Sequence, residues 1–214
     1  MPRGAATGER ARPAIAGVVL AAGASRRFGE LARQHKLLAP LGGKPLVRWA
    51  VEGMLASPVT RTLVVVGGEA AAVEGALGGL RVRFVLNEAY QAGMSTSLHA
   101  AVHALTADGG GVRAAVFALG DQPFVPSAVV ERLVHTFRAT GAPVVVPVYA
   151  GGERGHPVLF ASNLFPELLA VRGDEGARGV IARDRSRVTT VQFDFPAPRD
   201  VDLPGDLEAL RADV

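Results

Sequence analysis

The stretch that decides the fold is AGVVLAAGASRRFG, residues 16–29. An apolar run over residues 17–21 breaks into small residues and then two arginines. The apolar run predicts a buried strand, and the small residues predict a tight turn into a helix. Backbone N–H groups left open by small residues bind phosphate oxygens, and arginine adds charge-assisted hydrogen bonds. An ordinary strand-to-helix turn with solvated arginines fits the same letters, so both interpretations stay open at this point.

The composition is that of a globular protein without disulfides. The chain has 214 residues, 49% hydrophobic and 20% charged, and it has no cysteine, which excludes disulfides and cysteine metal sites. The net charge is +3 and no basic run is interleaved with aromatic residues, so the sequence does not indicate a nucleic-acid partner. No stretch approaches the ~20 apolar residues of a membrane span, so no membrane partner is expected.

The N-terminal residues differ from the rest of the chain. Residues 1–15 are basic, rich in Gly, Ala and Pro, and lack the apolar core of a secretory signal. We expect a flexible tail over 1–15, one domain over 16–214, and a cytoplasmic protein.

Apolar, β-branched runs alternate with helical patterns along the chain. Strands are expected over 17–21, 62–68, 82–87, 114–123, 143–149, 157–161 and 188–193, and helices over 44–57, 70–79, 97–107, 127–140, 163–171, 176–184 and 204–212. Ser127 is the expected N-cap of its helix and Gly141 its stop. The alternation predicts a single-domain α/β fold, a mainly parallel twisted sheet with helices on both faces. Ligands then bind beyond the carboxyl ends of the strands.

Charged residues occur where such a site is expected. The only lysines, Lys36 and Lys44, follow the opening stretch closely, and a lysine ammonium can neutralise a phosphate. Asp121 stands at the end of an apolar strand, where a carboxylate can hold Mg²⁺ together with substrate phosphates. Solvated lysines and an aspartate-capped turn are the simpler explanations.

Three later segments add polar groups. GMSTSL, residues 93–98, offers Ser95 or Thr96 either as a helix N-cap or as part of a turn that contacts a base. His156 stands at a strand entry, and residues 173–178 form a glycine-rich polar loop. Asp200 and Asp202 precede the last helix, where they either complete a metal site with Asp121 or favour the helix N-terminus.

The order of these segments resembles the MobA-like nucleotidyltransferase family and, within it, the molybdenum cofactor cytidylyltransferase branch. The resemblance is carried by LAAGASRRFG, KLLAPLGGKPL, GMSTSL, GDQPF, RGHPVLF, GDEGAR and DVDLPGDL, between residues 16 and 212. It implies a Rossmann-like nucleotidyltransferase fold and a reaction that joins a nucleoside triphosphate to a phosphorylated acceptor, with release of pyrophosphate. Ala22, where guanylyl-transferring relatives usually carry glycine, favours cytosine. The implied donor is CTP and the implied acceptor is molybdopterin carrying molybdenum, with a molybdoenzyme or its maturation chaperone as the candidate protein partner.

The resemblance also implies a role for each segment. The implied catalytic residues are Arg27, Lys36 and Asp121. The implied nucleotide-binding residues are Leu20, Ala21, Ala22, Gly23, Ser25, Arg26, Ser95 and Ser97, and the implied acceptor-binding residues are His156, Asp174 and Arg178. Asp121 and Asp202 would hold Mg²⁺, with Asp200 as the alternate ligand. Phosphoryl transfer of this kind needs positioning and charge neutralisation rather than covalent help.

Two other functions compete with this one. The first is a related transferase that uses GTP as donor or a sugar phosphate as acceptor. The second is a nucleotide-binding module that escorts a molybdoenzyme without catalysis, and the presence of Lys36, Asp121 and Asp202 argues against it.

Overall fold

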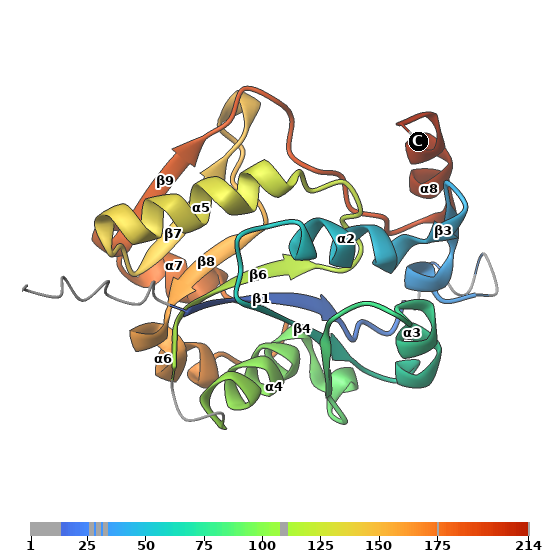
Figure 1. Ribbon diagram of the computed structural model, residues 1–214, viewed down its shortest axis with the longest axis horizontal. Coiled ribbons are helices and arrows are strands. Elements are labelled where there is room, and N and C mark those ends of the chain that lie inside the picture. Colours follow the sequence, from blue (N-terminus) through green and yellow to red (C-terminus); the bar gives the residue numbers. More distant parts are fainter. Residues whose placement is uncertain are drawn as a thin grey trace, which may run out of the picture.

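A seven-stranded sheet forms the centre of the molecule (Figure 1). The computed structural model describes residues 14–25, 28, 31, 34–107, 111–174 and 176–213. The strands lie in the order β5-β4-β1-β6-β8-β7-β9, and β2 and β3 form a separate two-stranded hairpin. The predicted α/β fold with a mainly parallel sheet is confirmed, because β8 is the one described strand of the large sheet that runs antiparallel to its neighbours.

The elements have the following bounds. The strands are β1 (Ala14–Ala21), β2 (Pro40–Leu41), β3 (Lys44–Pro45), β4 (Arg61–Val66), β5 (Arg83–Leu86), β6 (Val112–Leu119), β7 (Val144–Val148), β8 (Val158–Ala161) and β9 (Val188–Gln192). The described α-helices are α2 (Leu46–Leu55), α3 (Ala70–Ala76), α4 (Met94–Ala107), α5 (Ser127–Thr140), α6 (Phe165–Ala170), α7 (Arg178–Arg183) and α8 (Pro204–Leu210). Short 3-10 turns are η1 (Lys36–Leu38), η2 (Tyr90–Ala92), η3 (Ala150–Gly152), η4 (Ser162–Leu164), η5 (Arg185–Arg187) and η6 (Arg211–Asp213).

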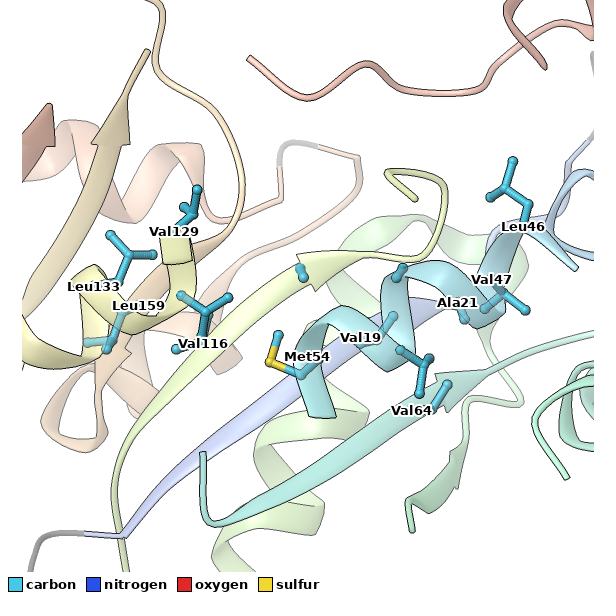
Figure 2. Close-up of a cluster of buried hydrophobic side chains, with 14 of the residues drawn as sticks. Val19, Ala21, Leu46, Val47, Met54, Val64, Val116, Val129, Leu133 and Leu159 are labelled. Carbon is cyan, nitrogen blue, oxygen red and sulfur yellow. The ribbon is translucent and has the colours of Figure 1, made fainter. Parts of the chain in front are cut away.

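Helices cover both faces of the sheet. On one face, α2 and α5 pack against alternate residues of β1, β4 and β6, as Figure 2 shows for Val19, Val64 and Val116. On the other face, α4 and α6 pack against the intervening residues, among them Val18 and Val65. Central strands buried on both faces explain why their sequences are nearly continuous apolar runs.

Gly17 lets α2 lie close to the sheet. A Cβ atom built on Gly17 would stand 2.5 Å from the Sδ atom of Met54, which lies in α2. The missing side chain therefore sets the distance between β1 and the helix that follows the β2–β3 hairpin.

The antiparallel strand β8 determines where the loop before it lies. β8 pairs antiparallel with both β6 and β7, so β6 and β7 run parallel to each other with β8 between them. The loop from β7 to β8, residues 149–157, is therefore at the edge of the sheet where β1 and β6 also end. His156, in this loop, is brought to the edge at which the sequence predicts a ligand.

Several predicted boundaries are wrong by a few residues. The helix expected from Lys44 begins at Leu46, because Lys44 and Pro45 pair with the preceding β2 strand. The helix expected from Ser97 begins at Met94, so Ser95 and Thr96 lie in its first turn and are not its N-cap.

The cap residues of α5 follow the prediction at one end only. Pro126 is the N-cap and no side chain caps the helix, so Ser127 is its first residue and not the predicted cap. Gly141 ends the helix as predicted, with a left-handed φ of 67° and its N–H donating to Phe137 O at 2.8 Å.

The N-terminal boundary differs slightly from expectation. β1 begins at Ala14, two residues inside the predicted tail, and the rest of that tail lies outside the described residues. No helix in the described part of the chain has the length and apolar character needed to cross a membrane.

Candidate active site

The site lies where β1 and β6 end side by side. The two strands are parallel neighbours, with Leu20 opposite Leu119, and the N–H of Gly120 continues the ladder by donating to Leu20 O at 2.9 Å. The chain after β1 forms the small-residue turn, and the chain after β6 presents Asp121 directly beside it. Parallel pairing thus brings together two segments that are far apart in the sequence.

Lys36 is held between two carboxylates. Its Nζ donates to Asp121 Oδ2 at 2.7 Å and to Asp202 Oδ1 at 3.0 Å. The lysine side chain is only 12% exposed, whereas that of Asp202 is 47% exposed. Burial acts to lower the pKa of Lys36, but attraction and hydrogen bonding from Asp121, and then from Asp202, outweigh it and raise this pKa. Lys36 is therefore positively charged, and the negative charges of Asp121 and Asp202 balance its charge.

The turn after β1 fixes the backbone of Lys36. Ser25 has a left-handed φ of 51°, and its Oγ accepts a hydrogen bond from the Lys36 N–H at 2.8 Å. The ring Nε2 of His35 lies 2.9 Å from Gly23 O, which ties the two segments together a second time. The proposed phosphate turn and the lysine are consequently one structural unit.

A C-terminal segment, residues 194–203, supplies Asp202, and we call it the C-terminal strap. Figure 1 shows it running from β9 to α8, which lies beside β3 in that view. The N–H of Val201, which is fully buried, donates to Asp121 O at 3.0 Å. Asp206 in the first turn of α8 accepts from the N–H groups of Asp202 at 2.9 Å and Leu203 at 2.7 Å. Backbone contacts therefore place Asp202 next to Asp121.

The structure separates the roles of Asp200 and Asp202. Gln122, which follows Asp121, donates through Nε2 to Asp200 Oδ1 at 2.5 Å. Partial burial raises the pKa of Asp200, the hydrogen bond from Gln122 opposes this, and repulsion from Asp121 and Asp202 adds to it. Asp202 and Asp121 thus both accept hydrogen bonds from Lys36, whereas Asp200, the alternate metal ligand, binds Gln122.

The carboxylates fit a divalent cation. Asp121 Oδ1 is buried and finds no hydrogen-bond partner in the part of the chain that the structure describes. A buried oxygen without a partner is costly, and hard divalent cations bind carboxylate oxygens. Among the described residues no group of three or more His, Asp or Glu side chains is placed to hold a metal. The remaining ligands of a cation here would come from solvent and substrate phosphates, as Mg²⁺ prefers.

His156 lies close enough to Asp200 and Asp121 for their negative charges to affect its pKa. Burial lowers its pKa, the Phe117 carbonyl and then Asp200 and Asp121 partly restore it, and Arg178 lowers it further. Its Nδ1 lies 3.4 Å from Phe117 O, and its own carbonyl accepts from the Tyr149 hydroxyl at 2.6 Å. Of the predicted acceptor residues, His156 therefore lies close to the carboxylates, and Arg178 lies close to His156.

The third predicted acceptor residue has a contact that the sequence did not reveal. Asp174 Oδ1 accepts from the N–H of Met94 at 3.2 Å, and Gly173 O accepts from the N–H of Ser95 at 3.0 Å. A Cβ on Gly93, whose φ is 111°, would stand 2.8 Å from Asp174 Oδ1. The loop after Val171 thus docks on the first turn of α4, and only a glycine at position 93 permits this.

Two of the predicted nucleotide-binding residues, Ser95 and Ser97, lie in the first turn of α4. Ser95 and Ser97 are both buried, and Ser97 Oγ accepts from Asn87 Nδ2 at 3.0 Å. Asn87, directly after β5, also donates to Thr96 Oγ1 at 2.8 Å and was not singled out from the sequence. Its position after a strand was the signal that could have found it. Contact of the two serines with a nucleotide stays a prediction.

The remaining predicted residues divide into three groups. Ala21 and Ala22 are buried, Leu20 is half-buried and Gly23 is exposed, so the turn presents backbone rather than side chains to solvent. Arg26 and Arg27 lie outside the described residues. Lys44 lies on the β2–β3 hairpin, where it pairs with Glu52 and stands 3.5 Å from the centre of the Trp49 ring. It therefore has partners of its own away from the site.

Several curated proteins are similar in sequence to this chain. The nicotine blue oxidoreductase of Paenarthrobacter nicotinovorans is 32% identical over 181 residues, which are 80% of this chain and 83% of that protein. The purine catabolism protein PucB of Bacillus subtilis is 29% identical over 93% of this chain and 97% of its own length. The bifunctional protein GlmU of Syntrophotalea carbinolica is 35% identical over 62% of this chain, and the chain spans only 27% of that protein.

Solved structures share the whole fold. A homologue of Mycobacterium tuberculosis Rv0371c from Mycobacterium sp. strain JC1 superposes with a TM-score of 0.82 at 33% identity, covering 94% of this chain and 97% of its own. A complex of Rv0371c with manganese has a TM-score of 0.78 at 29% identity, covering 94% of this chain and 100% of its own.

A family model settles the relationship. The model described as the MobA-like NTP transferase domain matches residues 17–188, which include Lys36 and Asp121 and end before the C-terminal strap. The fold, the solved structures and this match agree. The chain belongs to the MobA-like family of nucleotidyltransferases.

Proposed function

We propose that this chain transfers CMP from CTP to the terminal phosphate of molybdopterin carrying molybdenum. The observation that carries the proposal is the cluster of Lys36, Asp121 and Asp202 beside the small-residue turn after β1. A cation and two acids at that position suit a triphosphate held with a divalent metal. Sequence resemblance to the cytidylyltransferase branch supplies the choice of donor and acceptor.

The reaction needs little covalent chemistry from the protein. An oxygen of the acceptor phosphate attacks the α-phosphorus of CTP, the bond from that phosphorus to the bridging oxygen breaks, and pyrophosphate leaves with the electron pair. The attacking phosphate is already ionised, so no general base is required. The work of the protein is to align the two phosphates and to neutralise their charge.

The residues divide this work between the two substrates. The exposed backbone of Gly23 and Ala24 would contact the triphosphate, and Lys36 would neutralise its charge. Asp121 and Asp202 would hold Mg²⁺, which supplies charge stabilisation at the phosphate oxygens when bound. On the acceptor side, His156, whose pKa is lowered by burial, would donate a hydrogen bond as a neutral ring.

Ala22 supports CTP over GTP. Its methyl group packs into the apolar cluster beside α4, which also contains Leu98. The cytidylyltransferase branch resembles this chain at this position, and this resemblance supports CTP as the donor.

Pyrophosphate release tests the proposal. Purified protein is incubated with Mg²⁺, molybdenum-loaded molybdopterin and either CTP or GTP, and the dinucleotide product is identified by mass spectrometry. We expect release and the cytosine dinucleotide with CTP, and neither with Asp121→Asn. Release with GTP alone would move the chain to a guanylyl transfer. No release with either nucleotide would contradict the proposed acceptor, and sugar phosphates would be the next acceptors to test.

A further inference from the structure

The two carboxylates that fit a metal already share one cation of the protein. Lys36 Nζ donates to one oxygen of Asp121 and one oxygen of Asp202, at 2.7 and 3.0 Å. The lysine side chain is 12% exposed, so bulk water contributes little to its solvation. An ammonium group therefore stands where a divalent cation would share the same pair of acids.

We propose that Lys36 is a built-in counter-ion that occupies this acid pair until a triphosphate arrives. On this view the divalent metal binds the free protein weakly, and it binds tightly only together with the triphosphate. The inference rests on the proposed function only as far as a metal-dependent triphosphate site is concerned. It depends neither on the base of the nucleotide nor on the acceptor.

Electrostatics requires the two cations to compete. A divalent ion and an ammonium on the same two carboxylates repel each other at short range. A buried charge that loses its partners without gaining others is strongly disfavoured. Lys36 therefore leaves the acids readily only when another anion is within its reach.

A phosphate bound at the turn after β1 would be within reach of the lysine. The Lys36 N–H is bound to Ser25 Oγ, so the side chain starts from the phosphate turn itself. A lysine stem has four flexible carbons, so its ammonium can turn from the acids to a phosphate on that turn without a backbone change. Triphosphate binding would thus free the acid pair for the metal at the moment the metal is needed.

Contacts that do not involve Lys36 hold the backbone of both acids. Val201 N–H donates to Asp121 O, and Asp206 holds the backbone N–H of Asp202. Asp121 Oδ1 is buried with no partner among the described residues, so one further oxygen remains for a cation. Replacing Lys36 should therefore leave the two aspartates next to each other.

Direct metal binding tests the proposal without any turnover. The probe is Mn²⁺, counted as the free ion by electron paramagnetic resonance during titration of wild type and of Lys36→Met, without nucleotide. We expect Lys36→Met to bind Mn²⁺ roughly ten-fold or more tightly than wild type, within the usual range of coupling between two sites. Lys36→Arg keeps the charge and should show no such gain, and Lys44→Met, which removes the chain's other lysine, should match wild type.

Tripolyphosphate supplies the second arm, since it has neither base nor acceptor. It should raise the Mn²⁺ affinity of wild type and have a much smaller effect on Lys36→Met. Equal or weaker Mn²⁺ binding by Lys36→Met, with a far-UV circular dichroism spectrum like that of wild type, would overturn the proposal. Failure of the pyrophosphate assay would leave these titrations unaffected, so the two proposals can fail separately.

Discussion

The two lysines of this chain stand at the two ends of one short segment and have different partners. Lys44 finds them within its own neighbourhood, in Glu52 eight residues away and in the ring of Trp49. Lys36 finds them in Asp121 and Asp202, which are 85 and 166 residues away. The two lysines thus differ in the sequence separation of their partners, which is short for Lys44 and long for Lys36. Only the fold as a whole brings the partners of Lys36 together.

Lys44 belongs to a group of contacts that stabilise the packing of the β2–β3 hairpin on α2. Glu52 also accepts from Arg48 Nε at 2.9 Å, and Trp49 Nε1 donates to Leu41 O at 2.9 Å. These contacts fasten the β2–β3 hairpin to α2. The closeness of the two lysines in the sequence therefore reflects two separate roles, and only Lys36 lies at the carboxyl ends of the strands.

The largest effect is expected at the acid that faces Lys36. Asp121→Asn keeps the shape of the side chain but removes the negative charge, so turnover should fall by about a thousand-fold or more. The melting temperature should stay within a few degrees of wild type, as followed by circular dichroism. Pyrophosphate release near the wild-type rate would remove Asp121 from the site.

Replacement of the two lysines tests the comparison directly. Lys36→Met should lower kcat/KM by roughly 10²–10³-fold, the usual loss when one preorganised charge-stabilising group is removed. Lys44→Met should stay within about two-fold of wild type, because its partners lie away from the phosphates. The measurement is pyrophosphate release over a range of CTP concentrations. Equal losses in the two variants would show that the two lysines do not differ in their roles.

Gln122 provides a test of what holds the partners of Lys36 in place. Gln122→Ala removes the contact with Asp200, which fastens the C-terminal strap beside Asp121. We expect about 10–100-fold weaker Mn²⁺ binding, as for other residues that orient metal ligands. Gln192→Ala, at an exposed position of β9, is the matched control. Unchanged Mn²⁺ affinity in Gln122→Ala would show that the backbone contacts of Val201 suffice.

The smallest effect concerns stability at Lys44. The hydrogen bond from Lys44 lowers the pKa of Glu52, against the opposing effect of burial and with further help from Arg48. A lowered carboxyl pKa stabilises the fold above the ordinary glutamate range, and this contribution is lost as the pH falls through the lowered value. Lys44→Met should cost about 1 kcal/mol or less at pH 7 and less at pH 3. Urea unfolding at both pH values measures it, and a cost that does not shrink in acid would contradict the assignment.

The sequence predicted what local patterns determine. Apolar runs bounded by glycines located the strands of the large sheet, and the rule that ligands bind at strand ends selected Lys36 and Asp121. The direction of β8 was not predictable, because a four-residue apolar run carries no sign of its orientation. The contact of Asp174 with Met94 and that of Gln122 with Asp200 were missed for a related reason. They join segments about 80 residues apart, whose closeness depends on the packed fold.

The distance along the chain between Lys36 and Asp202 has a consequence for synthesis. A ribosome releases Lys36 first, Asp121 later and Asp202 last, and the first and the third are 166 residues apart. A nascent chain therefore carries the small-residue turn long before it carries the second acid. Since the strap brings that acid to the end of β6, the cluster of Lys36, Asp121 and Asp202 can form only after Asp202 has been made. Under the proposed function, partly made chains would then not consume nucleotide.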